Sequence, residues 1–147
     1  MKTIGVIGAG SWGTALATVV ADKGHTVRIW DIDEKHLRSM DEHRENVDYL
    51  PGVHLGDNIQ IVYDTADALK DSDVVLFSAP AQHFRSALGS ALPYIREDAL
   101  VINVAKGIEQ KTLERMSQIA AEKVDMNRYV VLSGPSHAEE VGRKLPT

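Results

Sequence analysis

The sequence predicts an α/β fold, a doubly wound and mostly parallel sheet with helices on both faces. Short, continuous apolar segments follow one another along the 147 residues, and helix-like segments separate them. Strands of this kind are typical of a parallel sheet that is covered on both faces. Glycines and polar residues directly follow several of these strands, and ligands bind at the carboxyl ends of strands in such sheets. We therefore expect a Rossmann-type domain whose functional residues come just after strands.

Each predicted element follows from its local pattern. Apolar runs that end at glycine, proline or polar residues predict strands over Thr3–Ile7, Thr26–Trp30, Ile59–Tyr63, Asp73–Ala79, Leu100–Val104 and Tyr129–Leu132. Alanine-rich or amphipathic spacing predicts helices over Thr14–Lys23, Glu34–Arg44, from Asp64 or Thr65 to near Lys70, over Gln82–Leu88 and over Thr112–Lys123. Tyr49–Gly52 contains Pro-Gly and predicts a turn.

Size and composition limit the kinds of protein that fit. We expect one domain over residues 1–147, because 44% hydrophobic residues suffice for one core. The net charge is -5 and no basic run occurs, so we expect neither a nucleic-acid partner nor stable membrane anchoring. The absence of cysteine excludes disulfides and thiolate metal sites, and we expect no metal. No signal peptide or apolar run of about 18 residues is visible, so we expect a cytoplasmic protein.

The segment VIGAGSWGTALA joins the first predicted strand to the first predicted helix and contains Gly8, Gly10 and Gly13. In a dinucleotide-binding fold the first glycine permits the tight turn, and the second lets the backbone approach a pyrophosphate. The third lets the helix pack closely on the strand. The helix N-terminus then offers free N–H groups to the phosphates. Glycines can also simply punctuate such a turn, but the strand–turn–helix setting favours a dinucleotide site.

Asp31 follows the second predicted strand, where an acid can accept hydrogen bonds from the adenosine ribose. Its carboxylate would repel the 2′-phosphate of NADP, and Asp33 adds negative charge, so we predict NAD over NADP. A helix-capping role is the alternative for Asp31. Trp12 lies in the variable part of the loop, beside the cofactor or, alternatively, in the core or at the surface.

With GAGSWGTALA, YLPG, KGIE and LSGPSHAEEV…PT in this order, the chain resembles bacterial NAD(P)-dependent glycerol-3-phosphate dehydrogenase from about Lys2 to Thr147. The resemblance implies an enzyme that interconverts sn-glycerol 3-phosphate and dihydroxyacetone phosphate by hydride transfer. It also implies an N-terminal dinucleotide-binding domain, a helical C-terminal substrate domain and a homodimer. Relatives that use NADP often carry Arg or His just after the second strand, where this chain has Ile32.

The resemblance also implies roles for particular residues. By this resemblance, cofactor contacts are expected at Ser11, Trp12, Lys106 and Ala138. They add to the glycine loop, Asp31 and Pro80, which are expected to contact the cofactor because they directly follow predicted strands. Substrate contacts are expected at Lys106, Gly134 and Ser136. Reduction of a ketone needs a positive or proton-donating group at the developing alkoxide, and Lys106 can supply such a charge.

The chain ends at Leu145-Pro146-Thr147, inside a family motif. The general acid/base lysine of the family lies beyond Thr147, so we expect no catalytic residue within the chain. We expect the helical substrate domain to be absent, and the isolated domain to bind cofactor without turnover. The alternatives are the N-terminal domain of a hydroxyacid-type dehydrogenase and a non-catalytic NAD-sensing module. His137 is expected to pack near the last helix, and the other histidines, including His36 and His83, to lie at the surface or in loops.

Overall fold

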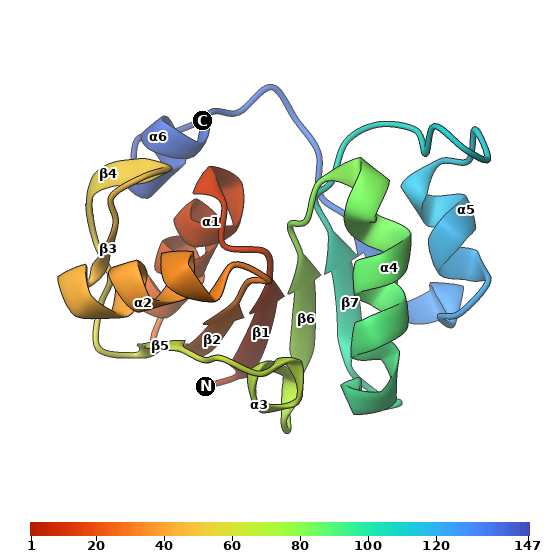
Figure 1. Cartoon of the computed structure of the whole chain (residues 1–147), viewed down its shortest axis with the longest axis horizontal. Helices are drawn as coiled ribbons and strands as arrows, with labels where there is room; N and C mark the ends of the chain where they lie inside the picture. Colours follow the sequence, from red (N-terminus) through yellow and green to blue (C-terminus); the bar gives the residue numbers. More distant parts are fainter.

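The computed structural model describes all residues from 1 to 147, and a six-stranded sheet lies at its centre (Figure 1). The strand order is β5-β2-β1-β6-β7-β8, and every pairing is parallel. The strands are β1 (Thr3–Ile7), β2 (Thr26–Trp30), β5 (Ile59–Ile61), β6 (Val74–Phe77), β7 (Leu100–Asn103) and β8 (Tyr129–Val131). The predicted fold class is confirmed. Because the chain builds outward from β1 first to one side and then to the other, the strand order reverses between β1 and β6.

Helices cover both faces of this sheet. They are α1 (Ser11–Asp22), α2 (Glu34–His43), α3 (Thr65–Leu69), α4 (Ala81–Ala91), α5 (Met116–Ala121) and α6 (Ala138–Gly142), with 3-10 turns at Leu92–Tyr94 and Met126–Arg128. In β1, Val6 belongs to a core with residues of α1 and α2, whereas Ile7 belongs to a core with α3, α4 and α5. Leu76 and Phe77 of β6 divide in the same way. Since neighbouring residues of a strand point to opposite faces, these two cores are the two sides of the sheet.

A β-hairpin stands where we predicted only a turn over Tyr49–Gly52. Its strands are β3 (Glu45–Asn46) and β4 (Leu50–His54), so three of those four residues belong to a strand. Leu50 and Val53 of β4 are buried in a small core with Ala15 of α1 and Ala138 of α6. The hairpin therefore depends on α6, which follows it by more than eighty residues and packs on both α1 and β4 (Figure 1).

The prediction for the fifth helix was wrong over its first turn, because α5 begins at Met116 and not at Thr112. Leu113 adopts a φ of 60° and is 76% exposed, which is incompatible with a helix interior. Instead, Ile108 pairs with Arg115 in an isolated antiparallel bridge. In contrast, α1 begins at Ser11, three residues before the predicted Thr14. None of the helices combines the length and hydropathy needed to cross a membrane.

Candidate functional site

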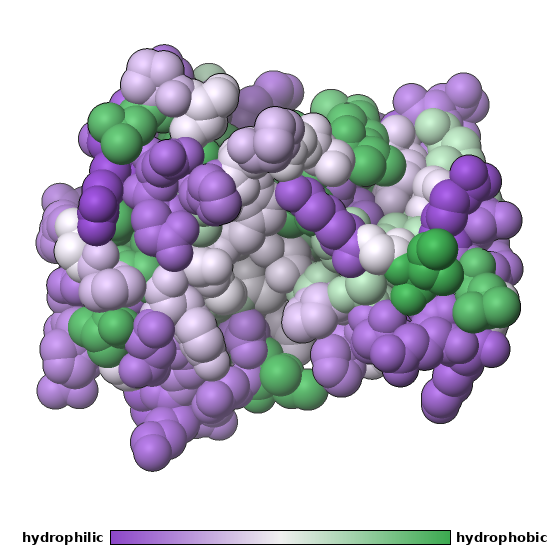
Figure 2. All heavy atoms as spheres, turned by 90° about the horizontal axis from the view of Figure 1, so that it is seen from above, coloured by the Kyte–Doolittle hydropathy of each residue, from purple (hydrophilic) through white to green (hydrophobic).

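A cleft of about 520 Å³ opens at the carboxyl ends of β1, β2 and β6, where the strand order reverses. Three segments supply most of its wall: the glycine loop after β1, the turn after β2 and the segment from β6 into α4. Figure 2 views this edge, where pale atoms of intermediate hydropathy fill the middle of the face between hydrophilic groups. The lining residues are Ile7, Gly8, Gly10, Trp30, Asp31, Ile32, Asp33, His36, Tyr49, Thr65, Ser78, Ala79, Pro80, His83, Ser86, Ala87 and Ser90.

The glycines of the loop differ in what surrounds them. Gly8 has a φ of +107°, and a Cβ there would lie 2.8 Å from backbone atoms of Ser78 and Ala79. A Cβ on Gly13 would lie 2.1 Å from the carbonyl oxygen of Gly8, so a side chain would push α1 away from β1. Gly10 has an ordinary extended conformation, and a Cβ there would meet nothing within 4 Å. The fold itself therefore does not require glycine at this position, but a ligand seated on the loop would.

The loop is held in place by side chains from elements beyond it. Asp31 accepts a hydrogen bond from the backbone N–H of Ala9 through Oδ2 (2.7 Å). The carbonyl oxygen of the same residue, Ala9, accepts from His36 Nε2 (3.0 Å) and Asn46 Nδ2 (2.9 Å). His36 is 6% exposed, so the prediction that it lies at the surface was wrong. Because these contacts fix the loop before any ligand arrives, the site is preorganised.

The first turn of α1 faces the same region without a competing cap. Gly10 is the N-cap residue and offers no side-chain hydrogen bond, and the first turn contains no acidic residue. The N–H groups of this twelve-residue helix are therefore available to an anion, and the helix dipole favours negative charge there. The open space above Gly10 and these unused donors fit the pyrophosphate of a dinucleotide.

A second group of predicted residues gathers beyond β7 and β8. Lys106 Nζ donates to the carbonyl oxygen of Gly134 (2.8 Å), which joins the two loops. Ser136 lies close by, since its Oγ is 3.6 Å from the position of a Cβ on Gly134. Gly107 has a φ of +125°, and a Cβ there would lie 3.4 Å from Ala81 at the start of α4. Lys106, Gly134 and Ser136 thus form a cluster whose loop lies close to the start of α4, next to the cleft-lining Pro80.

Of the other predicted residues, Ser11, Trp12 and Ala138 lie away from the cleft wall and Pro80 lines it. Trp12 is half-buried against the small core that contains Ala138, and Ala138 is 8% exposed, so its side chain faces the protein. Ser11 begins α1 without lining the cleft, whereas Pro80 lines the cleft directly as the N-cap of α4. Sequence reasoning missed Asn46 and the cleft-facing residues of α4. The spacing of His83, Ser86, Ala87 and Ser90 on one helical face is the signal that could have indicated the latter.

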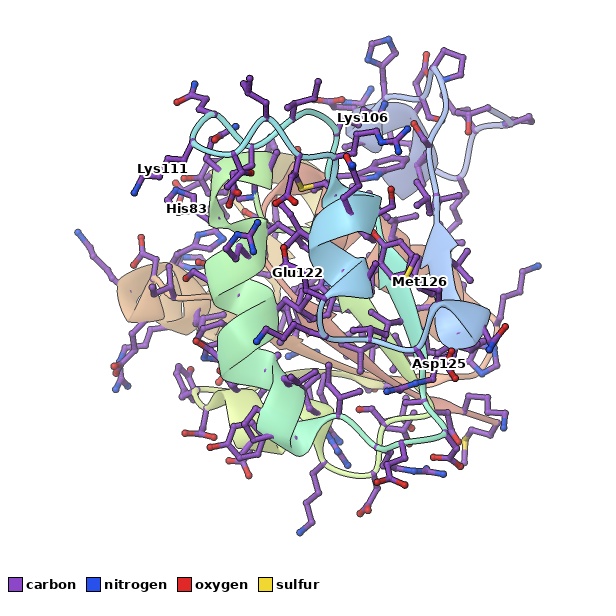
Figure 3. All side chains as sticks on the ribbon, turned by 90° about the vertical axis from the view of Figure 1, so that its right-hand side faces the viewer. His83, Lys106, Lys111, Glu122, Asp125 and Met126 are labelled. Carbon is purple, nitrogen blue, oxygen red and sulfur yellow. The ribbon has the colours of Figure 1, made fainter.

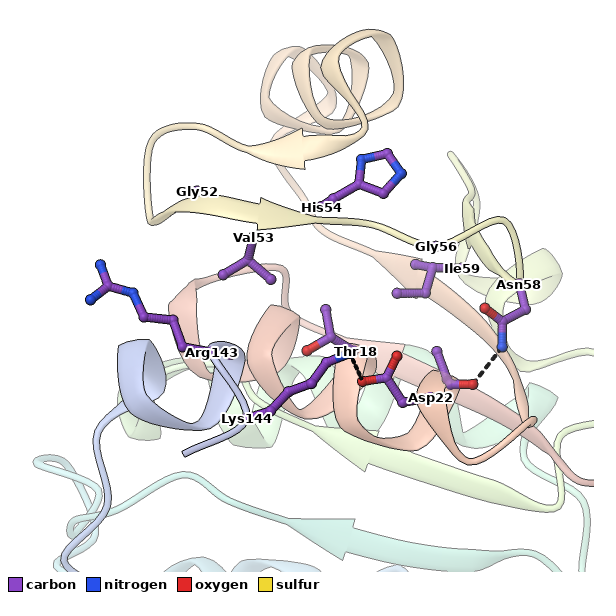
Figure 4. A pocket seen from close by; sticks show the side chains of 12 residues that line it. Thr18, Asp22, Gly52, Val53, His54, Gly56, Asn58, Ile59, Arg143 and Lys144 are labelled. Atoms are coloured by element: carbon purple, nitrogen blue, oxygen red, sulfur yellow. Dashed lines mark hydrogen bonds and ion pairs between the residues drawn. The ribbon is translucent and has the colours of Figure 1, made fainter. Parts of the chain in front are cut away.

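A separate cavity of about 410 Å³ lies between the hairpin, α1 and α6 and shares no lining residue with the cleft (Figure 4). Its polar groups connect these elements. Lys144 Nζ pairs with Asp22 at 2.8 Å, and Asn58 Nδ2 donates to the carbonyl oxygens of Ala21 and His25. These interactions hold the hairpin side of the fold together, so we treat this cavity as structural.

The parallel sheet, the glycine loop and the acid after β2 together define a Rossmann-type dinucleotide-binding domain. More specifically, the chain belongs to the family described as NAD-dependent glycerol-3-phosphate dehydrogenase N-terminus, whose model matches residues 3–147. A nicotinamide dinucleotide is the class of cofactor that follows from this membership.

Curated relatives and solved structures agree with this assignment. Glycerol-3-phosphate dehydrogenase [NAD(P)+] of Pelotomaculum thermopropionicum is 47% identical over 147 residues, covering 98% of this chain and 42% of the relative. The enzyme of the same name from Agathobacter rectalis is 42% identical, covering 100% and 44%. Glycerol-3-phosphate dehydrogenase of Coxiella burnetii superimposes with a TM-score of 0.90 at 30% identity, covering 99% of this chain and 45% of that one. The chain therefore spans less than half the length of these relatives.

Proposed function

We propose that this chain is the NAD-binding half of an oxidoreductase that interconverts sn-glycerol 3-phosphate and dihydroxyacetone phosphate by hydride transfer. The observation that carries the proposal is the open space above Gly10, where a Cβ would meet no atom within 4 Å, beside the uncapped N-terminus of α1. Family membership and the names of the relatives support the choice of reaction.

In this proposal the cofactor lies along the cleft. Its pyrophosphate is held over Gly10 by the N–H groups of Ser11 and Trp12, so these two residues contribute backbone and not side chains. The adenosine end runs past Asp31 toward the face of α4 that begins at Pro80. Ala138 is expected to contribute through its backbone, because its side chain is buried. Gly8 and Gly13 shape the loop.

We infer NAD, and not NADP, as the preferred cofactor from the charge at the rim of the cleft. Asp31 and Asp33 both line it, and Ile32 between them is 88% exposed and carries no charge. The nearest helix contains Arg38, but its guanidinium pairs with Glu34 and lies over the Tyr63 ring, 5.3 Å from the ring centroid. A 2′-phosphate would meet the carboxylates of Asp31 and Asp33, whose charge the exposed Lys35 and the paired Arg38 offset only in part.

The cluster at Lys106 is proposed to receive the substrate. When bound, the nicotinamide supplies or accepts the hydride. The Lys106 ammonium would exchange its contact with the Gly134 carbonyl for the substrate oxygen, where it stabilises the charge that develops on reduction. Ser136 offers a hydroxyl to the same ligand, and the Gly134 turn permits close approach. The general acid/base lysine is expected in the part of the relatives that this chain does not span, so the chain alone is expected to bind cofactor without turnover.

Titration of the purified chain with NADH and NADPH tests the cofactor assignment. Trp30 lines the cleft, so its fluorescence should report binding. We expect saturable binding of NADH with an affinity at least about tenfold higher than that of NADPH, equivalent to about 1.4 kcal/mol. Equal or tighter binding of NADPH would contradict the assignment of NAD. Absence of binding to both would refute the proposed function.

Activity is tested by adding dihydroxyacetone phosphate and NADH and following the absorbance of the reduced cofactor. We expect no turnover by this chain and turnover by a chain extended to the full length of the relatives. If the extended chain reduced a keto acid to its hydroxyacid but did not reduce dihydroxyacetone phosphate, the hydroxyacid-type alternative would replace the proposal. A cytoplasmic location and a homodimer stay predictions; the mass of the extended protein in solution tests the second.

A further inference from the structure

Arg85 of α4 is the centre of a cluster of three carboxylates. Its Nε and Nη2 each donate to Glu109 at 3.0 Å, and its Nη1 donates to Glu122 of the α5 end at 2.7 Å. Glu114 contacts the same guanidinium. Glu109 is 7% exposed and is the acid of the KGIE segment, three residues after Lys106. Figure 3 shows the Lys106 loop above α4 and α5, with Glu122 between these helices.

A second residue of α4 holds the same loop through its backbone. Gln82 Nε2 donates to the carbonyl oxygen of Ile108 (2.9 Å), and Gln82 Oε1 accepts from the N–H of Gln110 (2.9 Å). Gln82 and Arg85 are three residues apart, so they project from the same face of the helix. Together they bind residues 108–110 by both backbone and side chain, immediately after Lys106 and Gly107.

The same helix also forms part of the cofactor cleft, because His83, Ser86 and Ala87 line it. One rigid helix therefore contacts the cleft with one face and the Lys106 loop with another. Arg85 holds the pKa of the Glu109 carboxyl below its usual value by hydrogen bonding, so this acid stays ionised and paired. Without Arg85, a nearly buried carboxylate would lose its cation while Glu114 and Glu122 remain near it, and the loop would be expected to open.

We propose that Arg85 and Gln82 are positioning residues that fix Lys106 relative to the cofactor cleft through α4. The inference rests on the proposed function for the role of Lys106. That Arg85 and Gln82 hold residues 108–110 in place, which we call the clamp, does not depend on that function. Neither residue is expected to touch cofactor or substrate.

The test compares Arg85→Met with Arg96→Met in the purified chain. Arg96 is a matched control because its side chain is 40% exposed, against 37% for Arg85, and it also forms a two-bond pair with a carboxylate, Asp98. An amine-directed acylating reagent is applied in limited amount, and labelling of Lys106 is measured by mass spectrometry relative to Lys35 and Lys70. Lys106 is exposed, but its amine is held by the Gly134 carbonyl oxygen. We expect Arg85→Met to accelerate labelling of Lys106 about threefold or more, because a displaced loop loses this hydrogen bond, and Arg96→Met to leave the ratio unchanged.

Two further variants separate positioning from general damage to the fold. Arg85→Lys retains one charge and should recover part of the wild-type labelling ratio. Gln82→Ala removes only the two backbone contacts and should accelerate Lys106 labelling even if Arg85→Met does not fold. Wild-type labelling ratios in both Arg85→Met and Gln82→Ala, or equal acceleration in Arg96→Met, would overturn the proposal.

A parallel arm with saturating NAD distinguishes this inference from the proposed function. NAD should protect Lys106 in the wild-type chain but not in Arg85→Met, although both should bind NAD with affinities within about twofold, because Arg85 lies outside the cleft. A more than tenfold loss of NAD affinity in Arg85→Met would show that Arg85 acts on the cofactor and would refute its role as a positioning residue. Absence of NAD binding by the wild-type chain would contradict the proposed function. The labelling ratios without NAD would still show whether Arg85 and Gln82 position the Lys106 loop.

Discussion

Gly10 and Gly13 lie three residues apart, yet alanine substitutions at the two positions should affect different properties of the protein. A Cβ on Gly13 would lie 2.1 Å from the carbonyl oxygen of Gly8 in the backbone, and no flexible side chain can move to relieve the overlap. A Cβ on Gly10 would enter open space, with backbone angles that alanine adopts freely. Gly13→Ala should therefore mainly destabilise the fold, and Gly10→Ala should mainly weaken ligand binding.

The magnitudes follow from these contacts. Relief of the Gly13 overlap needs a shift of roughly 1 Å between α1 and β1, and overpacking of this kind costs about 1–3 kcal/mol. The better helix propensity of alanine returns at most about 1 kcal/mol. Because an approach of 2.1 Å to a backbone oxygen places the cost at the upper end of that range, we expect a net loss of about 2 kcal/mol. This loss lowers Tm by roughly 4–8 °C in a domain of this size. Gly10→Ala should lower the free energy of unfolding by only about 0.5–1 kcal/mol, because alanine is a poorer N-cap residue than glycine but meets no atom within 4 Å. It should weaken NAD binding at least about tenfold.

Urea unfolding gives the stability of both variants, and fluorescence titration gives their affinity for NADH. Unchanged affinity in a well-folded Gly10→Ala variant would refute the idea that a ligand sits on this glycine. Wild-type stability in Gly13→Ala would refute the close contact between helix and strand.

Three other predictions concern Ile32 at the rim of the cleft, Asn46 beside the glycine loop and Asp73 at the opposite edge of the sheet. Ile32→Arg should raise NADPH affinity about tenfold without a change in Tm, because the side chain is 88% exposed; titration with both cofactors checks this. Asn46→Ala should lower the free energy of unfolding in urea by about 2 kcal/mol, because the fully buried amide donates to Ala9 and supports the hairpin. The Thr3 N–H, followed by Lys2 and Arg96, holds the pKa of Asp73 below its usual value of 3.8. This carboxylate therefore stabilises the fold above about pH 4 and loses its contribution as pH falls through the lower folded-state pKa. Asp73→Asn should consequently be less stable than wild type at neutral pH, and urea unfolding should show that this difference shrinks in acid.

The sequence predicted those parts of the fold that depend on local pattern. β1 and β2 begin and end at the predicted residues, because their apolar runs are bounded by polar residues or glycine. The β3–β4 hairpin was not predictable in this way, since β4 gains its buried contacts from α6 near the other end of the chain. The prediction for the first turn of α5 was wrong because the local spacing indicated a helix that the structure does not form. Leu113 continues the helical spacing, but its N–H donates to the carbonyl oxygen of Glu109 in a turn that the Ile108–Arg115 bridge closes.

The candidate site shows the same division between local and distant causes. Gly8, Gly10, Asp31 and Pro80 could be predicted to gather, because the carboxyl ends of adjacent parallel strands meet at one edge. The role of Asn46 depends on a carbonyl oxygen 37 residues earlier in the chain, and no local pattern indicates such a pairing.

The hydrogen bonds that hold Ala9 show that Asp31 has a structural role as well as its proposed role in cofactor binding. Both carboxylate oxygens of Asp31 already accept backbone N–H groups, from Ala9 (2.7 Å) and Asp33 (3.0 Å). Each oxygen retains a second lone pair, so the same carboxylate can support the loop and still accept from a ribose hydroxyl. Asp31→Ala would therefore remove two functions at once, and a loss of NAD affinity in that variant would not distinguish them. Asp31→Asn keeps one oxygen that can accept from Ala9, so it separates support of the loop from recognition by charge. If charge is what excludes NADP, Asp31→Asn should improve NADPH binding while the stability of the chain stays near that of the wild type.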